Sequence, residues 1–247
     1  MRFLRVFTVT LVALLALSGA TVSQAAPTHT YIYLVRHGQS VDNANGLQSG
    51  WSSTPLTALG ERQATAMGKK LKTVVFGSAY SSGSVRAVKT LDAILAVRAT
   101  PIVGQVDPRF REWGVGSFDQ KPVSVLQAAQ AKKLKASVAD LWKFTDTAKF
   151  DAIAAVDPAK QAEKWSTFRN RILAGAGAVA KKGAGSNVIV VSHGYVIKHL
   201  IKQLTGKWAT GSISNTSVTV LDFTGGKWVL VQQPTLTPKV PAVLSGQ

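Results

Sequence analysis

A continuous apolar run, Asn187–Ser192 (NVIVVS), constrains the fold of this chain more than any other feature. A strand needs apolar residues at successive positions only when both of its faces are buried, which is typical of parallel sheets covered by helices. A second short run, residues 31–35 (YIYLV), is rich in aromatic and β-branched residues and also predicts a strand. Strand-like and helix-like segments alternate along the chain. The sequence therefore predicts a layered α/β domain with a largely parallel sheet.

Local signals predict the other elements. Thr57 and Ser84 are suited to cap helices over 58–72 and 85–98. Two further strands are expected at 74–80 and 101–103. Further helices are expected at 128–150, 159–182 and 195–204, followed by a hairpin of 218–223 with 228–232 across the turn 224–227.

The first 25 residues have the features of a secretory signal peptide. Arg2 and Arg5 precede an apolar stretch over 6–17, and Ser23-Gln24-Ala25 places small residues where a signal peptidase cleaves, so we expect cleavage after Ala25. The alternative is a membrane anchor, but the apolar stretch is shorter than the ~20 residues that a span requires. The sequence therefore predicts a protein that is secreted or associated with the cell envelope, with no membrane span after processing.

Composition excludes several classes of site. The chain has no cysteine, which excludes disulfides, thiol nucleophiles and cysteine zinc sites. Its four histidines do not favour a polyhistidine metal centre. Lys and Arg number 29 against 12 Asp and Glu. Removal of Arg2 and Arg5 leaves 27 positive against 12 negative side chains, a net charge near +15. This charge indicates acidic partners, such as an anionic envelope or phosphorylated substrates, while no nucleic-acid-binding motif is present.

Two His-Gly pairs follow the two apolar runs. They lie in the segments 34–40 (LVRHGQS) and 190–194 (VVSHG), and a third segment, 80–87 (YSSGSVRA), places Arg86 near another turn from strand to helix. In open α/β sheets, ligands bind beyond the carboxyl ends of the strands. The glycines let the backbone approach a ligand closely, and helix starts offer unpaired N–H groups to an anion. The pattern indicates an anion site at one edge of the sheet.

These segments together resemble the histidine phosphatase superfamily, in the branch that includes cofactor-dependent phosphoglycerate mutase and many small phosphatases. The matching motifs, in chain order, are Arg36-His37-Gly38, Asn43, 56–64 (LTALGERQA), Ser81-Ser82 with Arg86-Ala87, Arg111-Glu112 with Gly116 and Phe118-Asp119, and Ser192-His193-Gly194. The match runs from about Tyr31 to Gln232. Gln39 stands where the family commonly has Glu, and Phe118-Asp119 replaces Trp-Glu, but neither change removes a group that the chemistry requires.

The resemblance implies a three-layer α/β/α sandwich with a mostly parallel central sheet and a helical cap insertion. It places the histidine phosphatase domain at 26–232, with a cap region over about 120–165 and a loose tail over 233–247. The activity implied is the hydrolysis of phosphomonoesters.

The resemblance also assigns roles. His37 is the implied nucleophile, which forms a phosphohistidine that water then hydrolyses. Arg36 and Arg86 are expected to hold the non-bridging phosphate oxygens, because guanidinium keeps its charge and presents a planar fork of donors. His193, if protonated, adds a third cationic donor, and Asn43 can donate through its amide. Glu112 is the expected proton donor, since desolvation and a nearby dianion raise a carboxyl pKa.

With this much fixed positive charge the resemblance predicts neither a metal nor another cofactor. Each residue also has a plainer interpretation: Arg86 as a surface charge, Asn43 as a turn former, and Glu112 as an ion-pair partner of Arg109 or Arg111. Three functions stay open at this point. The leading one is a secreted, metal-independent phosphatase. The alternatives are phosphoglycerate mutase-type phosphotransfer and a non-catalytic basic protein that binds the envelope.

Overall fold

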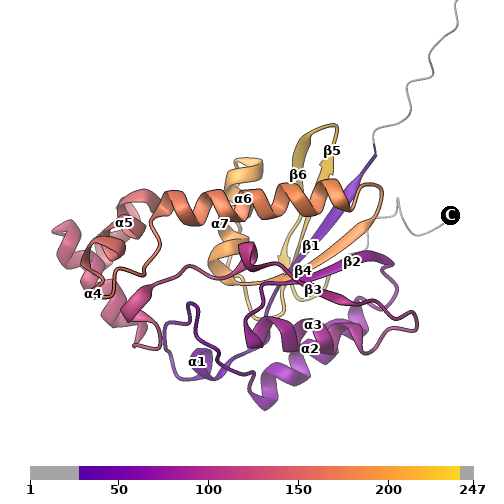
Figure 1. The fold of residues 1–247 in the computed structure, drawn as a ribbon, viewed down its shortest axis with the longest axis horizontal. Coiled ribbons are helices and arrows are strands. Elements are labelled where there is room, and N and C mark those ends of the chain that lie inside the picture. Colours follow the sequence, from indigo (N-terminus) through magenta and orange to yellow (C-terminus); the bar gives the residue numbers. More distant parts are fainter. Residues whose placement is uncertain (1–27, 240–247) are drawn as a thin grey trace, which may run out of the picture.

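The centre of the molecule is a six-stranded sheet with the order β3-β2-β4-β1-β5-β6 (Figure 1). The structure is a computed structural model that describes residues 28–239. The predicted signal peptide, residues 1–25, and the last residues of the predicted tail, 240–247, lie outside the described residues. The strands are β1 (Thr30–Arg36), β2 (Phe76–Ser81), β3 (Gly104–Val106), β4 (Asn187–Ser192), β5 (Val218–Thr224) and β6 (Lys227–Thr235).

The α-helices are α1 (Val41–Ala44), α2 (Ala58–Lys70), α3 (Val85–Leu95), α4 (Val123–Leu134), α5 (Asp146–Val156), α6 (Trp165–Lys182) and α7 (Gly194–Thr205). Three 3-10 helices, η1 (Pro108–Phe110), η2 (Gly116–Phe118) and η3 (Val138–Lys143), complete the described elements. No helix within residues 28–239 has the length and apolar character needed to cross a membrane.

The sheet is parallel at its centre and antiparallel at one side. β3, β2, β4 and β1 run parallel to one another, while β5 pairs antiparallel with β1 and forms a hairpin with β6. This arrangement confirms the largely parallel sheet and the final hairpin. β4 lies between β2 and β1 and is buried at all six positions, as its uninterrupted apolar sequence predicts.

Both faces of the sheet are covered, so successive strand residues enter different cores. In β1, Ile32 and Leu34 belong to the core under α6 and α7, whereas Tyr31, Tyr33 and Val35 belong to the core above α2 and α3. The period-2 alternation of a strand explains this division. Figure 1 shows the two helical layers on opposite sides of the sheet, which confirms the three-layer sandwich.

The prediction of a strand at 101–103 is wrong. The strand is β3, which begins at Gly104 opposite Ala79 of β2. Pro101 has no N–H to donate to a ladder, and Val103 is 81% exposed. The expected strand at 74–80 is observed as Phe76–Ser81, with a register shift at Gly77.

Two expected helices are shorter than predicted. The single helix expected at 128–150 is three elements, α4, η3 and α5, because Lys135 ends α4 in the left-handed region and the Ser137 and Thr145 side chains cap new helical turns. The helix expected at 159–182 begins only at Trp165. Before it, the Asp157 carboxylate accepts hydrogen bonds from the N–H groups of Gln161 and Ala162 and holds a tight turn.

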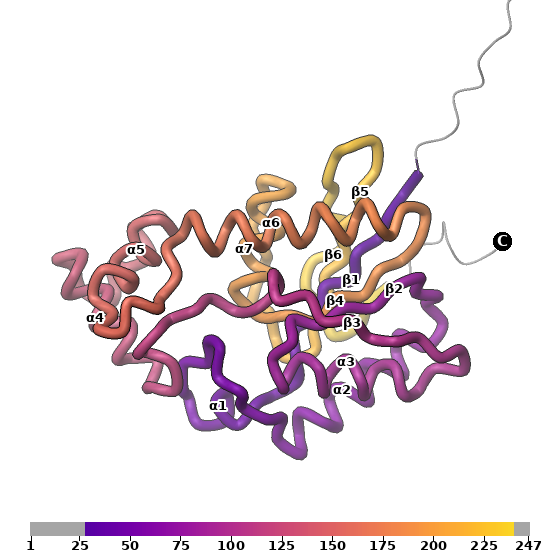
Figure 2. The backbone as a smooth tube through the Cα atoms, viewed as in Figure 1, coloured from indigo at the N-terminus to yellow at the C-terminus, as the bar shows by residue number. Residues whose placement is uncertain are grey.

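The segment from α4 to α5 lies beyond one end of the sheet, on the side where α1 is also found (Figure 2). α4 packs on both η3 and α5, and α5 also contacts α6. Phe150 of α5 is buried against Trp113 and Phe168, so this cap is joined to the main core by aromatic packing. We refer to residues 123–156 as the cap.

Candidate active site

The two His-Gly loops meet because β1 and β4 are parallel neighbours whose carboxyl ends coincide. Arg36 pairs with Ser192 at the end of the ladder, and the next residue on each strand is a histidine. The His37 N–H donates to the Ser192 carbonyl at 3.0 Å. The ring centroids of His37 and His193 lie 5.1 Å apart, with an angle of 60° between the ring planes. Parallel pairing therefore brings together residues that are 156 positions apart in the sequence.

A cavity of about 510 Å³ opens at this edge of the sheet. Four of the predicted residues line it, namely Arg36, His37, Asn43 and Glu112. Arg86 and His193 are fully buried and lie in contact with each other directly behind them. The structure thus brings all six predicted residues into one cluster, in which four face the cavity and two support it.

The His37 ring is oriented by its own loop. Nδ1 lies 2.7 Å from the carbonyl oxygen of Gly38, so Nδ1 carries the proton and Nε2 keeps its lone pair. Among the described residues, no hydrogen-bond partner occupies Nε2. Burial lowers the pKa of His37 well below its usual value, and the positive charges of Arg86 and Arg36 lower it further. The ring is therefore neutral at neutral pH, as a nitrogen nucleophile must be.

Arg36 and Arg86 both retain donors that no described residue uses. Arg36 donates from Nη1 to the carbonyl oxygen of Ile213 at 2.7 Å, and Arg86 donates to the carbonyl oxygens of Gly50 and Ser52 at 2.8 and 2.9 Å. The Nε atoms of both guanidinium groups are buried and unpartnered. A buried donor without a partner costs free energy, which an anion bound here would recover.

His193 is expected to be a cationic donor only if its ring is protonated, and its surroundings favour the neutral ring. Its Nδ1 accepts a hydrogen bond from Arg86 at 3.3 Å, so its Nε2–H donates to the Ser82 hydroxyl at 2.8 Å. Burial lowers the pKa of His193 well below its usual value, and the Arg86 charge adds to this effect. His193 is accordingly neutral at neutral pH.

Ser82 and Ser84 are site residues that the sequence reasoning did not select. Ser84 occupies the N-cap position of α3 as predicted but makes no capping hydrogen bond. Its hydroxyl instead lies 3.0 Å from the Ser82 hydroxyl and 3.3 Å from Nε2 of His193. The Ser-Ser motif was the available signal, since it follows a predicted strand at the same sheet edge.

Asn43 lies on the short helix α1 and lines the cavity. Its side chain forms hydrogen bonds within the protein. Its Oδ1 accepts from the Ser40 N–H at 3.3 Å and from the Asn215 amide at 3.2 Å, which leaves the Asn43 amide group as a donor. Asn215 also donates to the His37 carbonyl at 2.9 Å. Asn215 is a second residue that sequence reasoning missed, because nothing in its local sequence distinguishes it from an ordinary loop asparagine.

Glu112 is buried and does not pair with either nearby arginine. Its Oε1 accepts from the Trp113 N–H at 2.9 Å, and its Oε2 accepts from the Tyr195 N–H at 3.2 Å. Arg109 pairs with Asp107 at 2.7 Å, and no ion pair joins Arg111 to Glu112 among the described residues. Desolvation raises the pKa of Glu112 above its usual value and outweighs the two hydrogen bonds. A buried carboxyl group at the wall of the cavity is suited to hold a proton.

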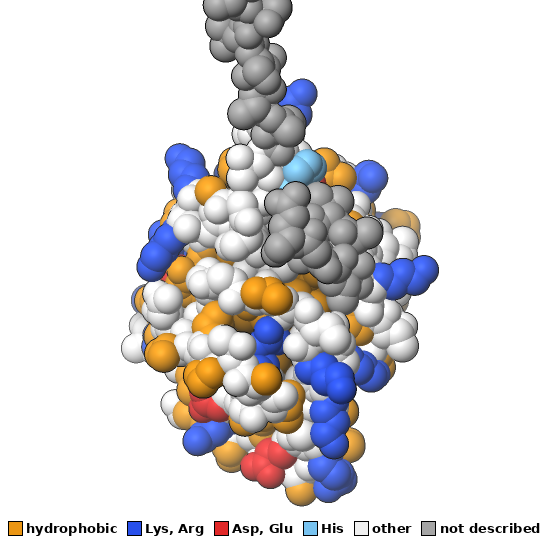
Figure 3. Space-filling model, turned by 90° about the vertical axis from the view of Figure 1, so that its right-hand side faces the viewer, with side chains coloured by type: hydrophobic (Ala, Val, Ile, Leu, Met, Phe, Trp, Pro, Cys, Tyr) orange, Lys and Arg blue, Asp and Glu red, His pale blue; other side chains and the backbone are white. Residues whose placement is uncertain are grey.

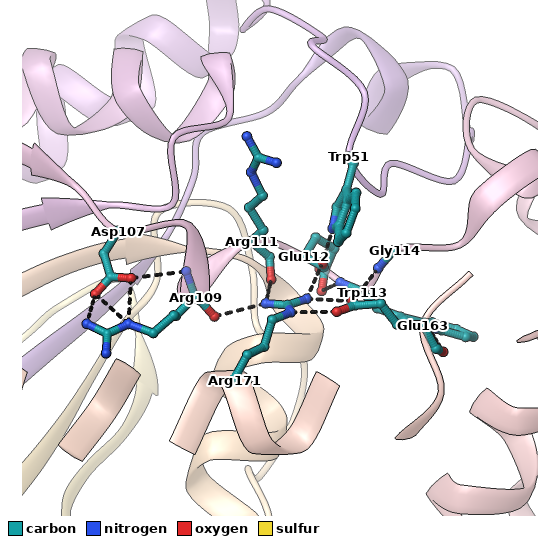
Figure 4. Close-up of polar contacts among 9 residues, drawn as sticks. All are labelled: Trp51, Asp107, Arg109, Arg111, Glu112, Trp113, Gly114, Glu163 and Arg171. Carbon is teal, nitrogen blue, oxygen red and sulfur yellow. Dashed lines mark hydrogen bonds and ion pairs between the residues drawn. The ribbon is translucent and has the colours of Figure 1, made fainter. Parts of the chain in front are cut away.

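The backbone that carries Glu112 is fixed by a partly buried ion pair (Figure 4). Arg171 of α6 binds both carboxylate oxygens of Glu163 at 2.7 Å. The same guanidinium donates to the carbonyl oxygens of Arg109, Arg111 and Glu112 at 2.9, 2.6 and 2.7 Å. Arg171 thus holds the backbone of residues 109–112, the segment that ends at Glu112. The helical pattern of α6 gave no sign of this role.

The two glycines after the histidines serve different purposes. A Cβ on Gly38 would lie 2.5 Å from the carbonyl oxygen of Gly60, so this glycine lets the loop pack directly on α2. A Cβ on Gly194 would make only an ordinary contact of 3.9 Å with Arg36, and Gly194 lines the cavity. Of the two, only Gly194 lies where a missing side chain leaves space for a ligand, as the sequence analysis expects of both glycines.

Metal-binding side chains do not gather at this site. Within residues 28–239, no cluster of three or more His, Cys, Asp or Glu side chains has the arrangement needed to hold a metal ion. The ionisable side chains at the site are the guanidinium groups of Arg36 and Arg86, the Lys198 ammonium group at the cavity wall and the buried carboxyl group of Glu112.

Comparison with known proteins identifies the family. The family model of the histidine phosphatase superfamily (branch 1) matches residues 32–234. The "Probable phosphoglycerate mutase GpmB" of Yersinia enterocolitica is 25% identical over 202 residues, which cover 80% of this chain and 87% of that protein.

Two solved structures illustrate the similarity of fold. The crystal structure of a phosphoglycerate mutase from Bacillus anthracis has a TM-score of 0.77 and 33% identity, covering 83% of this chain and 93% of that chain. The crystal structure of the alpha-ribazole phosphatase from Shigella flexneri has a TM-score of 0.68 and 23% identity, covering 85% of this chain and 99% of that chain. The second likeness concerns the fold alone.

Proposed function

Since the chain belongs to the histidine phosphatase superfamily (branch 1), we propose that it is a metal-independent phosphatase that hydrolyses phosphomonoesters through a phosphohistidine on His37. The observation that carries this proposal is the state of the His37 ring. It is neutral, its Nδ1 is bound to Gly38, and its free Nε2 lies at a cavity lined by Arg36.

In the first step, the Nε2 lone pair of His37 attacks phosphorus and the bond from phosphorus to the alcohol oxygen breaks. Glu112 gives its proton to that oxygen, so the alcohol leaves neutral. The charge on the three equatorial oxygens is stabilised by Arg36 and Arg86, and each preorganised donor of this kind can supply ~3–4 kcal/mol in the transition state.

In the second step, water attacks the phosphorus of the phosphohistidine. The Glu112 carboxylate takes a proton from that water, the P–N bond breaks, and inorganic phosphate leaves. His37 and Glu112 return to their starting states. Asn43 donates its amide to the phosphate throughout.

The test is hydrolysis of p-nitrophenyl phosphate by purified protein in the presence of EDTA. We expect turnover that EDTA does not reduce and that His37→Ala abolishes. Undiminished turnover in His37→Ala would overturn the nucleophile, and loss of activity in EDTA that Mg²⁺ restores would overturn metal independence.

A second candidate is phosphoglycerate mutase-type phosphotransfer. The mutase names of the Yersinia and Bacillus proteins favour it, the latter at 33% identity. Incubation with 3-phosphoglycerate separates the two functions when free phosphate and isomerised product are measured independently. A phosphatase yields free phosphate, whereas a mutase yields 2-phosphoglycerate with little phosphate release.

We further propose that the protein is exported and that its positive charge holds it at an anionic envelope. The signal-like segment 1–25 and the excess of basic residues support this. Lys and Arg outnumber Asp and Glu on the face drawn in Figure 3. The mature N-terminus should be Ala26, and high salt should release the protein from envelope material. Retention that is insensitive to salt would contradict charge-based attachment.

A further inference from the structure

We propose that the natural substrate is a phosphomonoester whose leaving alcohol carries a flat, hydrogen-bonding ring, and that this ring binds between the cap and α7 against Trp142. The inference rests on the proposed phosphatase function and specifies its substrate class. It is carried by a second cavity that adjoins the catalytic one.

The second cavity has a volume of about 160 Å³. Its lining shares Gln48, Val123 and Tyr195 with the catalytic cavity, so the two hollows have a common wall. The other lining residues come mainly from the cap, where Leu126, Gln130, Leu141 and Trp142 contribute. A substrate with its phosphate at His37 would therefore direct its leaving group from the first cavity toward the second.

The second cavity has the size of a small flat group. Its volume is about five times the ~30 Å³ that one water occupies in the liquid, which suits one ring or two fused rings.

The lining combines apolar side chains with glutamine amide groups and one lysine. Lys149 is the cationic group in this lining, and it pairs with Asp146 at 3.2 Å. The Gln130 amide nitrogen donates to the Lys149 carbonyl at 3.0 Å, which leaves its oxygen as an acceptor. A neutral ring is favoured here over a second phosphate, since the positive charge is already compensated.

Gln48 and Trp142 supply the specific contacts. Gln48 is only 9% exposed, yet its side-chain amide has no hydrogen-bond partner among the described residues. Trp142 is 77% exposed and stands at the rim, where one ring can stack on another. The Trp142 ring offers an apolar face for stacking, and the Gln48 amide can form hydrogen bonds with the edge of a bound ring. This combination suits a heteroaromatic ring.

The experiment compares two substrates that share one scissile bond. Adenosine 5′-monophosphate and ribose 5-phosphate both release phosphate from a primary alcohol, but only the first carries a flat heteroaromatic base. We expect kcat/KM to be more than about tenfold higher for adenosine 5′-monophosphate than for ribose 5-phosphate, because stacking of a base on an aromatic side chain strengthens binding by about this factor. Trp142→Ala should reduce this ratio to near one, and Trp142→Phe should restore much of it.

Val138→Ala is the matched control, because Val138 is an exposed apolar residue on the same 3-10 helix and lines neither cavity. It should leave the ratio unchanged. A ratio near one in the wild type, or a high ratio that Trp142→Ala does not lower, would overturn the ring site while leaving the phosphatase function intact.

If neither compound is hydrolysed, calorimetric binding decides the question independently. Tighter binding of adenosine 5′-monophosphate than of ribose 5-phosphate, lost in Trp142→Ala, would support the ring site even though the proposed function had failed. Equal binding of the two compounds would reject it.

Discussion

The Nδ1 atom of His37 lies 2.7 Å from the carbonyl oxygen of Gly38. This contact fixes which ring nitrogen carries the proton, so Nε2 presents a lone pair to the cavity. Gly38 itself is held because its Cα packs against the backbone of Gly60 in α2. The orientation of the nucleophile therefore depends on how closely the loop after β1 approaches a helix from another part of the chain.

His37 should remain neutral at mildly acidic pH. Burial and the charges of Arg86 and Arg36 disfavour the imidazolium and hold the pKa of His37 well below 6.5. In ligand-free protein, ring ¹⁵N chemical shifts recorded from pH 7.5 to 5.5 should show the Nδ1–H neutral form throughout this range. A midpoint at or above 6.5 would contradict the arrangement described for this site.

Glu112→Gln should reduce turnover most for substrates with poor leaving groups. The pKa of Glu112 is raised by desolvation, so the carboxyl group can hold the proton that an alkoxide needs. The loss in kcat/KM should be ~10²–10⁴-fold for alkyl phosphates and much smaller for p-nitrophenyl phosphate. Equal losses across a leaving-group series would argue against an acid role.

Arg171→Lys should weaken both the fold and the placement of Glu112. Lysine keeps the charge but cannot bind Glu163 at two points while also donating to three carbonyls. We expect the free energy of unfolding to fall by about 1.5–3 kcal/mol. The leaving-group dependence of kcat/KM should also become steeper.

Arg169→Lys is the control for that variant, since Arg169 lies on the same helix and bonds to Gln203. It should change neither the unfolding free energy nor the leaving-group dependence by a comparable amount. Wild-type behaviour of Arg171→Lys in both measurements would show that the ion pair does not position Glu112.

The layered fold and the position of the site could be predicted because their determinants are local. The NVIVVS run is buried on both faces at every position, and parallel pairing necessarily brings the loops after β1 and β4 together. The strand at 101–103 was misplaced because apolar residues suggest a strand without indicating which N–H groups meet a partner. The helix at 128–150 was overextended because the cap at Ser137 and the left-handed Lys135 interrupt a sequence of good helix formers.

The supporting contacts of the site could not be predicted, since they join residues distant in sequence. Ser82 binds His193 across 111 positions, and Arg171 binds the Glu112 carbonyl across 59. The protonation state of His193 could not be predicted either. It depends on complete burial beside Arg86, which is a property of packing rather than of any motif.

Stability should decrease as pH falls from about 6.5 toward 4, in part because of His199. This residue is fully buried among Phe150, Trp165 and Phe168, and it lies 3.4 Å from Asp146 without a hydrogen bond. Burial lowers the pKa of His199 to about 4. The unfolded chain, with its ordinary pKa near 6.5, binds the proton first, so acid favours unfolding in this window.

Urea unfolding of wild type and His199→Leu at pH 7.5 and pH 5 tests that contribution. The wild type should lose up to about 2 kcal/mol more than the variant between the two conditions. The comparison removes the similar contributions of His37 and His193, which both proteins share. Identical pH dependence in the two proteins would contradict a neutral, buried His199.

The most direct test of the account is to trap the covalent intermediate. Protein mixed with a ³²P-labelled phosphomonoester should be quenched in alkaline detergent, because a P–N bond survives base and is lost in acid. Peptide analysis should place the label on His37, and His37→Gln should carry none. Label on a serine or on another histidine, or no label during active turnover, would contradict His37 as the nucleophile.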